Sequence, residues 1–181
     1  MKNNLLIFVI LLFFSCERSK NEENSLKSYF YNIYGKDNVV KGHFKRVVYH
    51  QNDSIRIDTI YRYNKDKSLA DTYIDRFLIT KNGIKSTYRE DYFNTKDLDS
   101  CIVYSNNNNQ EFKSCFIESK SEIIINDSVF NNVSKYLIVQ LTSHGLTKEK
   151  YLDEDLVLIR EEYIDGYAPY YRIDRVKNID N

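Results

Sequence analysis

The sequence has few of the residues that interrupt regular structure. It contains one proline and five glycines among 181 residues, against sixteen tyrosines and ten phenylalanines. A chain so rich in strand-forming side chains and so poor in breakers favours long strands joined by polar turns. It has no glycine-rich phosphate-binding loop, which argues against nucleotide-dependent enzymes.

An excess of charge of one sign is also lacking. Basic and acidic side chains number 26 each, and 25 basic side chains remain when Lys2 is removed. The charges alternate along the chain and form no blocks, so no net field attracts nucleic acid. We therefore expect no nucleic-acid partner.

Signatures of catalysis are missing as well. No GxSxG surrounds any serine, no CxxC is present, and the histidines (His43, His50 and His144) have no metal-site spacing. The acidic run 153–155 could hold calcium, but it lacks the glycine and the distal glutamate of an EF-hand loop. We predict a protein that is not an enzyme and has neither cofactor nor metal; hydrolysis is the third and weakest hypothesis.

The first fifteen residues have the composition of an export signal. Lys2 precedes an uninterrupted apolar run at 5–14, and Ser15 and Cys16 follow it. Ten residues rise only about 15 Å as a helix, roughly half the thickness of a bilayer core, so a permanent span is disfavoured. We assign 1–15 to a signal peptide, 16–24 to a flexible, charged tether and 25–181 to a single β-rich domain.

The end of this signal resembles the lipobox of bacterial lipoproteins, in which a small residue precedes a lipidated cysteine. Ser15 and Cys16 match that pattern, whereas Phe13 and Phe14 are bulkier than its usual residues. The resemblance implies that Cys16 carries acyl chains such as palmitate and anchors the domain to the cell envelope, where we expect the outer membrane. The alternative is an ordinary secretory signal with an incidental cysteine.

Segment 25–34 predicts a short amphipathic helix. Its apolar residues are spaced at i, i+3, i+4, i+7 and i+8, which places them on one helical face: Leu26, Tyr29, Phe30, Ile33 and Tyr34. We expect this face to pack on a sheet, the alternative being that it lies on the membrane.

From residue 39 onward, the hydrophobic pattern has a period of two, which is typical of strands with one buried face. The predicted strands are 40–49, 54–63, 72–80, 84–93, 100–104, 111–118, 122–125, 136–142, 148–152, 156–164 and 170–176. Short polar turns join them, so the fold class is mainly β (α+β), a helix followed by a twisted antiparallel meander. A closed barrel, a half-barrel and a sandwich stay open as alternatives.

A helix followed by such a meander resembles the half-barrel architecture of lipoprotein carriers and related envelope lipoproteins. The stretch 150–153 followed by 156–161 is similar to the late hairpin of that group, where an acidic turn joins two strands. The resemblance implies a curved sheet wrapped around the helix, and it carries no diagnostic residue.

Cys101 and Cys115 are predicted to form a disulfide, since export places them in an oxidising compartment. The centre of a symmetric hairpin between them falls at (101 + 115)/2 = 108, inside the asparagine run 106–109. The same register sets Tyr104 opposite Phe112, a favourable aromatic pair. Free buried thiols and a metal site are the alternatives.

The aromatic cluster near the C-terminus is a candidate surface for stacking a sugar, a peptide or a partner. It consists of Tyr163, Tyr167, Tyr170 and Tyr171, interleaved with Arg172 and Arg175. Tyrosines on both faces of a strand also serve as core on one side and cover on the other, which is the alternative.

Three tripeptides resemble the Asp, Ser/Thr, aliphatic acceptor of O-glycans in exported proteins of the Bacteroidota. They contain Ser54, Thr59 and Ser128. The resemblance implies that these three hydroxyls face solvent.

The leading hypothesis from the sequence is a non-catalytic envelope lipoprotein that binds a hydrophobic or extended ligand, or a partner protein. It predicts an apolar concavity between helix and sheet. The second hypothesis is a structural or surface-interaction lipoprotein with a filled core.

Overall fold

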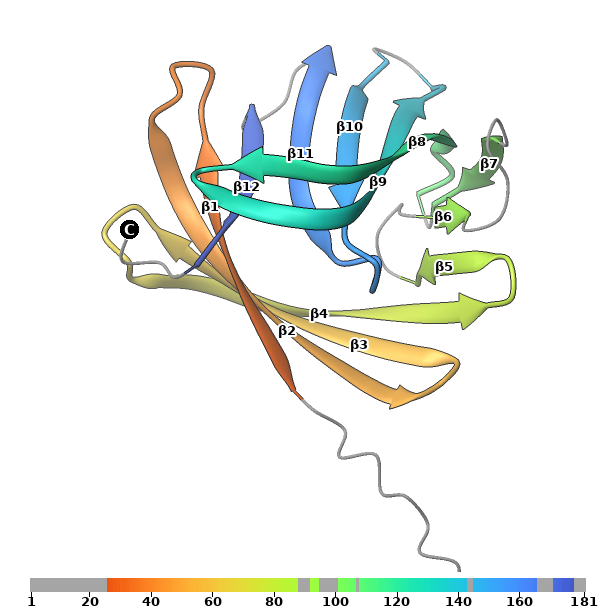
Figure 1. The fold of residues 1–181 in the computed structure, drawn as a ribbon, viewed down its shortest axis with the longest axis horizontal. Coiled ribbons are helices and arrows are strands. Elements are labelled where there is room, and N and C mark those ends of the chain that lie inside the picture. Colours follow the sequence, from red (N-terminus) through yellow and green to blue (C-terminus); the bar gives the residue numbers. More distant parts are fainter. Residues whose placement is uncertain are drawn as a thin grey trace, which may run out of the picture.

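The computed structural model describes residues 26–87, 92–94, 101–106, 108–142, 145–165 and 171–177, and these form one antiparallel sheet rolled into a nearly closed barrel (Figure 1). The strands are β1 (Lys27–Tyr34), β2 (Val40–Asn52), β3 (Ile55–Asn64), β4 (Leu69–Thr80), β5 (Gly83–Ser86), β6 (Tyr92–Asn94), β7 (Cys101–Ser105), β8 (Glu111–Ile125), β9 (Ser128–Gln140), β10 (Thr147–Leu152), β11 (Leu158–Asp165) and β12 (Arg172–Val176). Over the described residues, no helix is both long and apolar enough to cross a membrane.

The sheet consists of two meanders that meet at the ends of the chain. The strand order is β6-β5-β4-β3-β2-β1-β12-β11-β10-β9-β8-β7, so each half follows the sequence and β1 pairs with β12. In that pairing Tyr31 lies opposite Arg175 and Ile33 lies opposite Ile173. The first and last strands of the domain therefore hold the two halves together.

Side chains close the barrel where β6 approaches β7 and β9. The rings of Tyr92 and Tyr104 meet edge to face with centroids 6.2 Å apart, and Phe93 meets Tyr136 at 5.0 Å. Of the three architectures that the sequence left open, the nearly closed barrel is the one observed.

The predicted helix at 25–34 is wrong, because 27–34 form strand β1. The helical spacing and the strand period of two both fit this short segment. Tyr29, Tyr31 and Ile33 have the strand period, and in β1 they face the barrel core. Aromatic and β-branched side chains suit a pleated surface, and β1 is hydrogen-bonded on both edges, to β2 and β12. Backbone pairing on two sides outweighs the weak helical preference of an isolated eight-residue segment.

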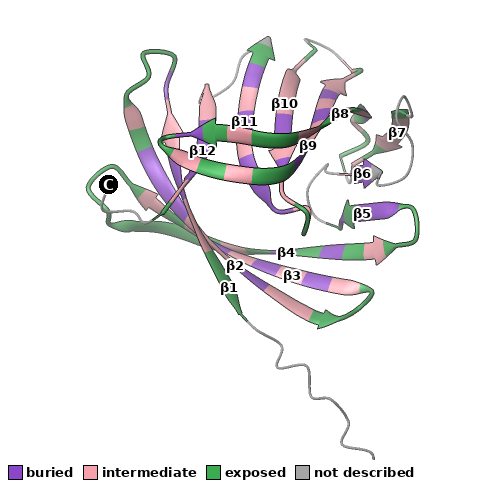
Figure 2. Ribbon diagram, in the orientation of Figure 1, coloured by how far each residue is buried: buried purple, intermediate pink, exposed green. Residues whose placement is uncertain are grey.

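Alternation of buried and exposed residues along the strands follows the predicted period of two (Figure 2). The inward residues of both meanders form one core, in which the ring of Tyr31 stacks on that of Phe44 with centroids 4.2 Å apart. The Tyr31 hydroxyl donates a hydrogen bond to the carbonyl oxygen of Leu158 at 2.8 Å, so β1 is tied to β11, which lies beyond β12 in the sheet.

Strands β8 and β9 form a longer hairpin than the sequence pattern predicts. The predicted strands 111–118 and 122–125 are one strand, and β9 begins eight residues before the predicted start at 136. A register shift between Phe116 and Glu118 breaks the alternation that the prediction relies on. Asn126 and Asp127 have φ of 47° and 58°, the left-handed pair that a two-residue hairpin turn requires. Predicted strand 84–93, in contrast, is divided between β5 and β6, with residues 88–91 outside the described part.

The far half of this hairpin crosses the outside of the barrel, in front of β11 and β12 in Figure 1. There Ile125 and Val133 pack against Ile159 of β11 in a second, smaller core. Ile159 points outward because of a bulge: Leu152 lies opposite Leu158, whereas Tyr151 lies opposite Arg160.

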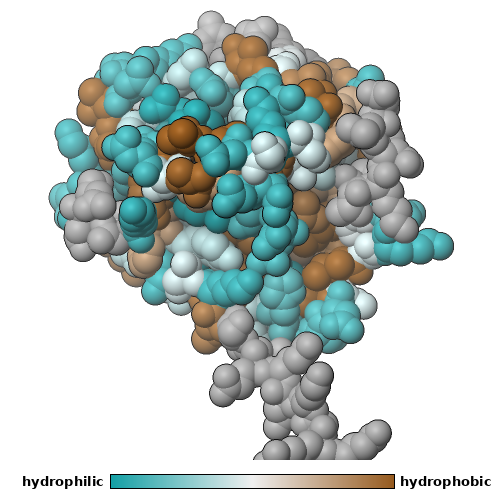
Figure 3. Space-filling model, in the orientation of Figure 1, coloured by the Kyte–Doolittle hydropathy of each residue, from teal (hydrophilic) through white to brown (hydrophobic). Residues whose placement is uncertain are grey.

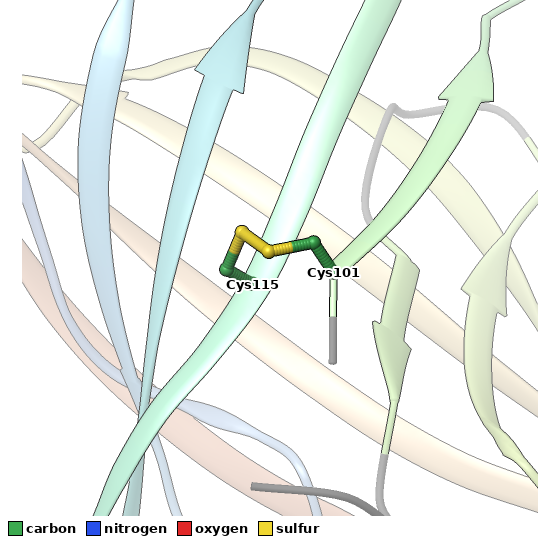
Figure 4. The surroundings of a disulfide bond; sticks show 2 residues. All are labelled: Cys101 and Cys115. Carbon is green, nitrogen blue, oxygen red and sulfur yellow. A yellow bond between two sulfur atoms is a disulfide. The ribbon is translucent and has the colours of Figure 1, made fainter. Parts of the chain in front are cut away.

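The predicted disulfide is confirmed. Cys101 of β7 and Cys115 of β8 lie directly opposite each other and are bonded (Figure 4). Tyr104 and Phe112 are also opposite, with stacked rings 5.8 Å apart, as the symmetric register predicts. The bond fastens the terminal strand β7 to the rest of the sheet beside the closing seam.

Replacing Ile159 with alanine should detach the hairpin. Ile159 is fully buried in the small outer core, so Ile159→Ala should lower the free energy of unfolding by roughly 2 to 5 kcal/mol. Amide hydrogen exchange near Ile125 should also accelerate. Ile124→Ala, at a position of the same hairpin with 65% exposure, is the control and should change neither quantity. Unchanged exchange near Ile125 in Ile159→Ala would contradict the docking.

Removing the disulfide should destabilise the barrel. The bond closes a loop with a sequence separation of 14, and in the chain-entropy model such a loop contributes ~3 kcal/mol. Urea unfolding of the Cys101→Ser/Cys115→Ser double variant should show that loss. Reductant should lower the parent's stability by a similar amount and leave the double variant unaffected; a loss on reduction in both proteins would contradict the assignment.

Candidate functional site

The barrel encloses a cavity of about 350 Å3. Strands of both meanders line it, with β2–β4 on one side and β10–β12 on the other. Its volume lies within the range of small-molecule sites, which is roughly 300 to 1,000 Å3. The cavity is therefore the candidate functional site of the chain.

One part of the cavity wall is apolar. It is made by buried aromatic and aliphatic side chains that alternate inward on their strands, namely Phe44, Phe77, Phe93, Leu152, Leu158 and Ile173. Such a wall supplies apolar area for a ligand, although the sequence predicts this concavity between a helix and the sheet. Strand β1 occupies the place of the predicted helix, so the concavity lies within the sheet itself.

The other part of the wall carries cationic side chains, each of which is paired with a carboxylate. Five cationic residues line the cavity, Lys41, Arg46, Arg56, Arg62 and Lys150, against one acidic residue, Glu161. Basic side chains thus predominate at the wall although the whole chain is neutral. A cavity of this kind favours a ligand that has an apolar body and an acidic group.

Arg46 and Arg56 share one buried carboxylate. Asp58 is fully buried; its oxygens lie 3.0 Å from Nε of Arg56 and 3.6 Å from Nη1 of Arg46. The guanidinium of Arg56 stacks over the ring of Phe77, 4.3 Å from its centroid. Burial lowers the pKa of Arg56, and the charge of Asp58 acts in the opposite direction.

A second ion pair faces this group across the cavity. Lys150 of β10 and Glu161 of β11 lie directly opposite each other and are almost fully buried, with Nζ 2.9 Å from Oε2. Nζ of Lys148 lies 3.9 Å from the same oxygen, and Lys150 also stands over the ring of Phe93 at 5.7 Å. Burying such ions is costly unless they are paired, so this arrangement fixes how β10 and β11 face the cavity.

Two arginines seal one end of the barrel against the β10–β11 turn. Nη1 of Arg56 donates hydrogen bonds to the carbonyl oxygens of Asp155 and Leu156, at 3.0 and 3.2 Å. Arg175 donates to the carbonyl oxygens of Val157 and Leu158 and to the carboxylate of Asp153.

The turn they hold has an unusual backbone. Leu156 has φ of 55°, a left-handed conformation that leucine rarely adopts. The two bonds from Arg56 end on Leu156 and its neighbour, so they support the backbone that closes the cavity. Lys27, at the start of β1, pairs with Asp155 at 2.7 Å, which places the beginning of the described chain at this closed end.

The opposite end of the cavity is open. Lys41, Arg62, Asn64 and Ala70 line the cavity and are exposed, whereas the deeper lining residues are buried. These four lie where β2 begins and where β3 turns into β4, at the far end of the sheet from Lys27. A ligand would enter there.

Of the predicted tyrosine surface, the described residues bring only Tyr163 and Tyr171 together, where the N–H of Tyr163 donates a hydrogen bond to the carbonyl oxygen of Tyr171 at 2.9 Å. Tyr163 is buried beside Lys148, whose Nζ lies 5.8 Å from the ring centroid, whereas Arg172 lies on the outside of β12, with its Nε 2.9 Å from Asp174. Tyr171 is half-buried, and Tyr167 and Tyr170 lie outside the described part. A ligand or partner at this surface stays a prediction.

The three candidate glycosylation hydroxyls occupy different settings. Ser54 is exposed in the β2–β3 turn, while Thr59 on the outer face of β3 and Ser128 at the start of β9 are half-buried. Cys16, the predicted lipidation site, lies outside the described residues. Modification at all four positions stays a prediction.

Three of the acidic and histidine candidates have structural partners, while His144 lies outside the described residues. Asp153 and Asp155 pair with Arg175 and Lys27, and His43 is buried with its Nδ1 2.8 Å from Asn32 Oδ1. Burial and nearby Lys67 lower the pKa of His43, which favours its neutral form. Among the described residues, His, Cys, Asp and Glu form no group of three that could hold a metal.

The interior charges are not among the residues that the sequence predicts. Arg46, Arg56, Lys150 and Glu161 alternate with outward residues, just as core positions do. The strand period of two could have indicated these charged residues. It is usually read from apolar residues alone, because charged side chains seldom face a core. Charged residues in phase with an apolar strand face would have indicated the cavity.

Comparison with known proteins finds similarity in fold. No family model and no curated protein matches the chain. A protein of Bacteroides fragilis, assigned as exported and as having a YmcC-like fold, aligns with a TM-score of 0.54 and 9% identity, over 83% of this chain and 95% of its own. A protein of Parabacteroides distasonis, assigned as a lipoprotein, aligns with a TM-score of 0.52 and 8% identity, over 82% of this chain and 94% of its own. At these identities the likeness shows a shared fold alone.

Proposed function

We propose that this chain is an envelope lipoprotein of a bacterium, anchored through Cys16, whose barrel binds a small molecule without chemical conversion. The observation that carries the proposal is the 350 Å3 cavity, closed at one end and open at the other. Its apolar and basic walls suit a molecule with an apolar body and a carboxylate, sulfonate or phosphate group. A cavity of this size favours ligand binding over the alternative of a filled core.

Export and anchoring have separate support. The apolar run, Ser15 and Cys16 form the signal, and the two proteins of similar fold are assigned as exported and as a lipoprotein. Two or more acyl chains anchor a protein stably, whereas one is marginal. The outer membrane is the location that we propose, with the cavity mouth at the end of the barrel far from the anchor.

Blocking the mouth of the cavity should abolish ligand binding. The chain from Glu17 to Asn181 keeps every strand of the barrel, so it is suitable for solution measurements. Its probe is 1-anilinonaphthalene-8-sulfonate, which combines an aromatic body with an anionic group. Ala70→Trp places a large side chain at the mouth, and we expect the affinity for the probe to fall at least tenfold.

Leu69→Trp is the matched control for this experiment. Leu69 is the neighbouring residue on β4, it is 59% exposed, and it does not line the cavity. This variant should bind the probe as the parent does. Equal affinity of parent and Ala70→Trp, with both melting at the same temperature, would remove the cavity as the binding site. Mass spectrometry of an organic extract of the parent should then identify a natural ligand as an acidic, partly apolar molecule.

Replacing Cys16 should release the protein from membranes. Metabolic labelling with a tagged fatty acid should mark the parent and the Cys101→Ser/Cys115→Ser variant, and it should leave Cys16→Ala unlabelled. Cys16→Ala should also leave the membrane fraction. An unlabelled parent, or a Cys16→Ala variant that sediments fully with membranes, would contradict the anchor and would leave the cavity argument intact.

A further inference from the structure

The outer face of β2–β4 differs from the rest of the surface. Side chains that alternate away from the cavity make this face, and they are largely aliphatic or aromatic: Val47, Tyr49, Ile57, Tyr61, Ile74 and Leu78. Ile74 is 62% exposed and Leu78 is 40% exposed. We call these six residues the β2–β4 face.

The six residues form a continuous patch. Tyr49 lies opposite Ile57, and Thr59 links Val47 on one side to Ile74 on the other. Strands are about 4.8 Å apart, so these side chains lie within a band about 10 Å across between the strand axes, interspersed with Thr59 and with Arg76, which lies opposite Ile57. Val47, Tyr49, Ile57 and Tyr61 are half-buried around the exposed Ile74 and Leu78, and exposed apolar side chains grouped in this way are typical of interaction sites.

Acidic side chains are excluded from this face. Six acidic residues occur between Lys27 and Thr87. Asp58 and Asp75 point into the barrel, and Asp71 pairs with Arg62 at the cavity mouth. The other three lie in turns: Asp37, Asp53 and Asp66.

The charged residues that do lie on or beside this face are basic. Lys45 stands over the ring of Phe30 at 5.7 Å, and Arg76 and Lys85 are exposed. The whole chain has no net charge, whereas the charged residues on and beside this face are basic.

The opposite wall has a different character. Outward residues of β10–β12 include carboxylates that are paired with cations, such as Glu149 with Lys135 and Asp174 with Arg160. The face crossed by the β8–β9 hairpin is covered mostly by hydrophilic side chains, with small separate hydrophobic patches (Figure 3). The combination of apolar, aromatic and exclusively basic residues belongs to the β2–β4 side of the barrel.

We propose that the β2–β4 face docks on the surface of a lipid bilayer that contains anionic lipids. Aliphatic side chains can enter the headgroup boundary, tyrosines favour the membrane–water interface, and basic residues attract anionic headgroups. The charge of the face matches this occupant, because acidic residues would be repelled and none lies on it.

The course of the chain supports the same occupant. Lys27 pairs with Val48, next to Val47 of the face, so the chain leaves the barrel at the border of the patch. Ten residues follow Cys16 up to and including Leu26, and they reach at most about 35 Å when fully extended. An anchor at Cys16 therefore keeps the face within reach of the bilayer. The inference rests on the anchoring proposed above, but not on ligand binding.

A fluorescence experiment tests the orientation directly. The chain contains no tryptophan, so one introduced indole reports a single position. Because Cys101 and Cys115 are bonded, Cys16 supplies the free thiol with which the chain from Cys16 to Asn181 can be coupled to a maleimide lipid. The vesicles consist of phosphatidylcholine and phosphatidylglycerol, with or without brominated acyl chains as quenchers.

Ile74→Trp and Ile124→Trp are the matched variants, since these positions are 62% and 65% exposed on different sides of the barrel. Bromolipids should reduce the fluorescence of Ile74→Trp at least twofold and leave that of Ile124→Trp nearly unchanged. Adding Arg76→Glu and Lys85→Glu to Ile74→Trp should weaken the quenching. Equal quenching at both positions, or none at position 74, would overturn the proposal.

A second copy of the chain is the other occupant that the test distinguishes. Sedimentation of the chain from Glu17 to Asn181 should show a monomer. A dimer that Ile74→Asp dissociates would assign the face to self-association and overturn membrane docking. Because coupling at Cys16 is chemical, the quenching result is independent of fatty-acid labelling in cells, so failure of docking and failure of anchoring are distinguishable.

Discussion

The pairing of β1 with β12 is the constraint on which the rest of this structure depends. Each half of the chain is a simple meander, and neither encloses a cavity by itself. When β1 takes β2 on one edge and β12 on the other, the two halves become one sheet that curls until β6 meets β7 and β9. The same pairing brings Arg175 above Tyr29 and Tyr31, where it binds the turn that closes the cavity.

The barrel interior combines two kinds of chemistry. Its apolar wall stabilises the fold through removal of surface from water, while its buried ions are held by partners on neighbouring strands. Arg56 has two tasks, since it pairs with Asp58 and binds the carbonyl oxygens of the β10–β11 turn. A filled hydrophobic core would dispense with this network, because well-packed apolar side chains need no buried charges to balance.

Much of the fold could be predicted from the sequence, because strand periodicity and turn residues are local signals. The disulfide followed from the position of one asparagine run between Cys101 and Cys115. The helix at 25–34 failed, since eight residues satisfy two periodicities and only the distant strand β12 decides between them. The inward charges were missed for a related reason: their partners lie on other strands, and Lys150 and Glu161 become a pair only through the register of β10 and β11.

Closure by the two ends of the domain also has a consequence for biogenesis. In a protein exported from its N-terminus, β1 emerges first and its partner β12 emerges last. Until then one edge of β1 has unpaired backbone groups, the kind of edge that recruits foreign strands. Contacts so distant in sequence form slowly, so the nascent domain has a period of vulnerability to aggregation that ends when its final strand arrives.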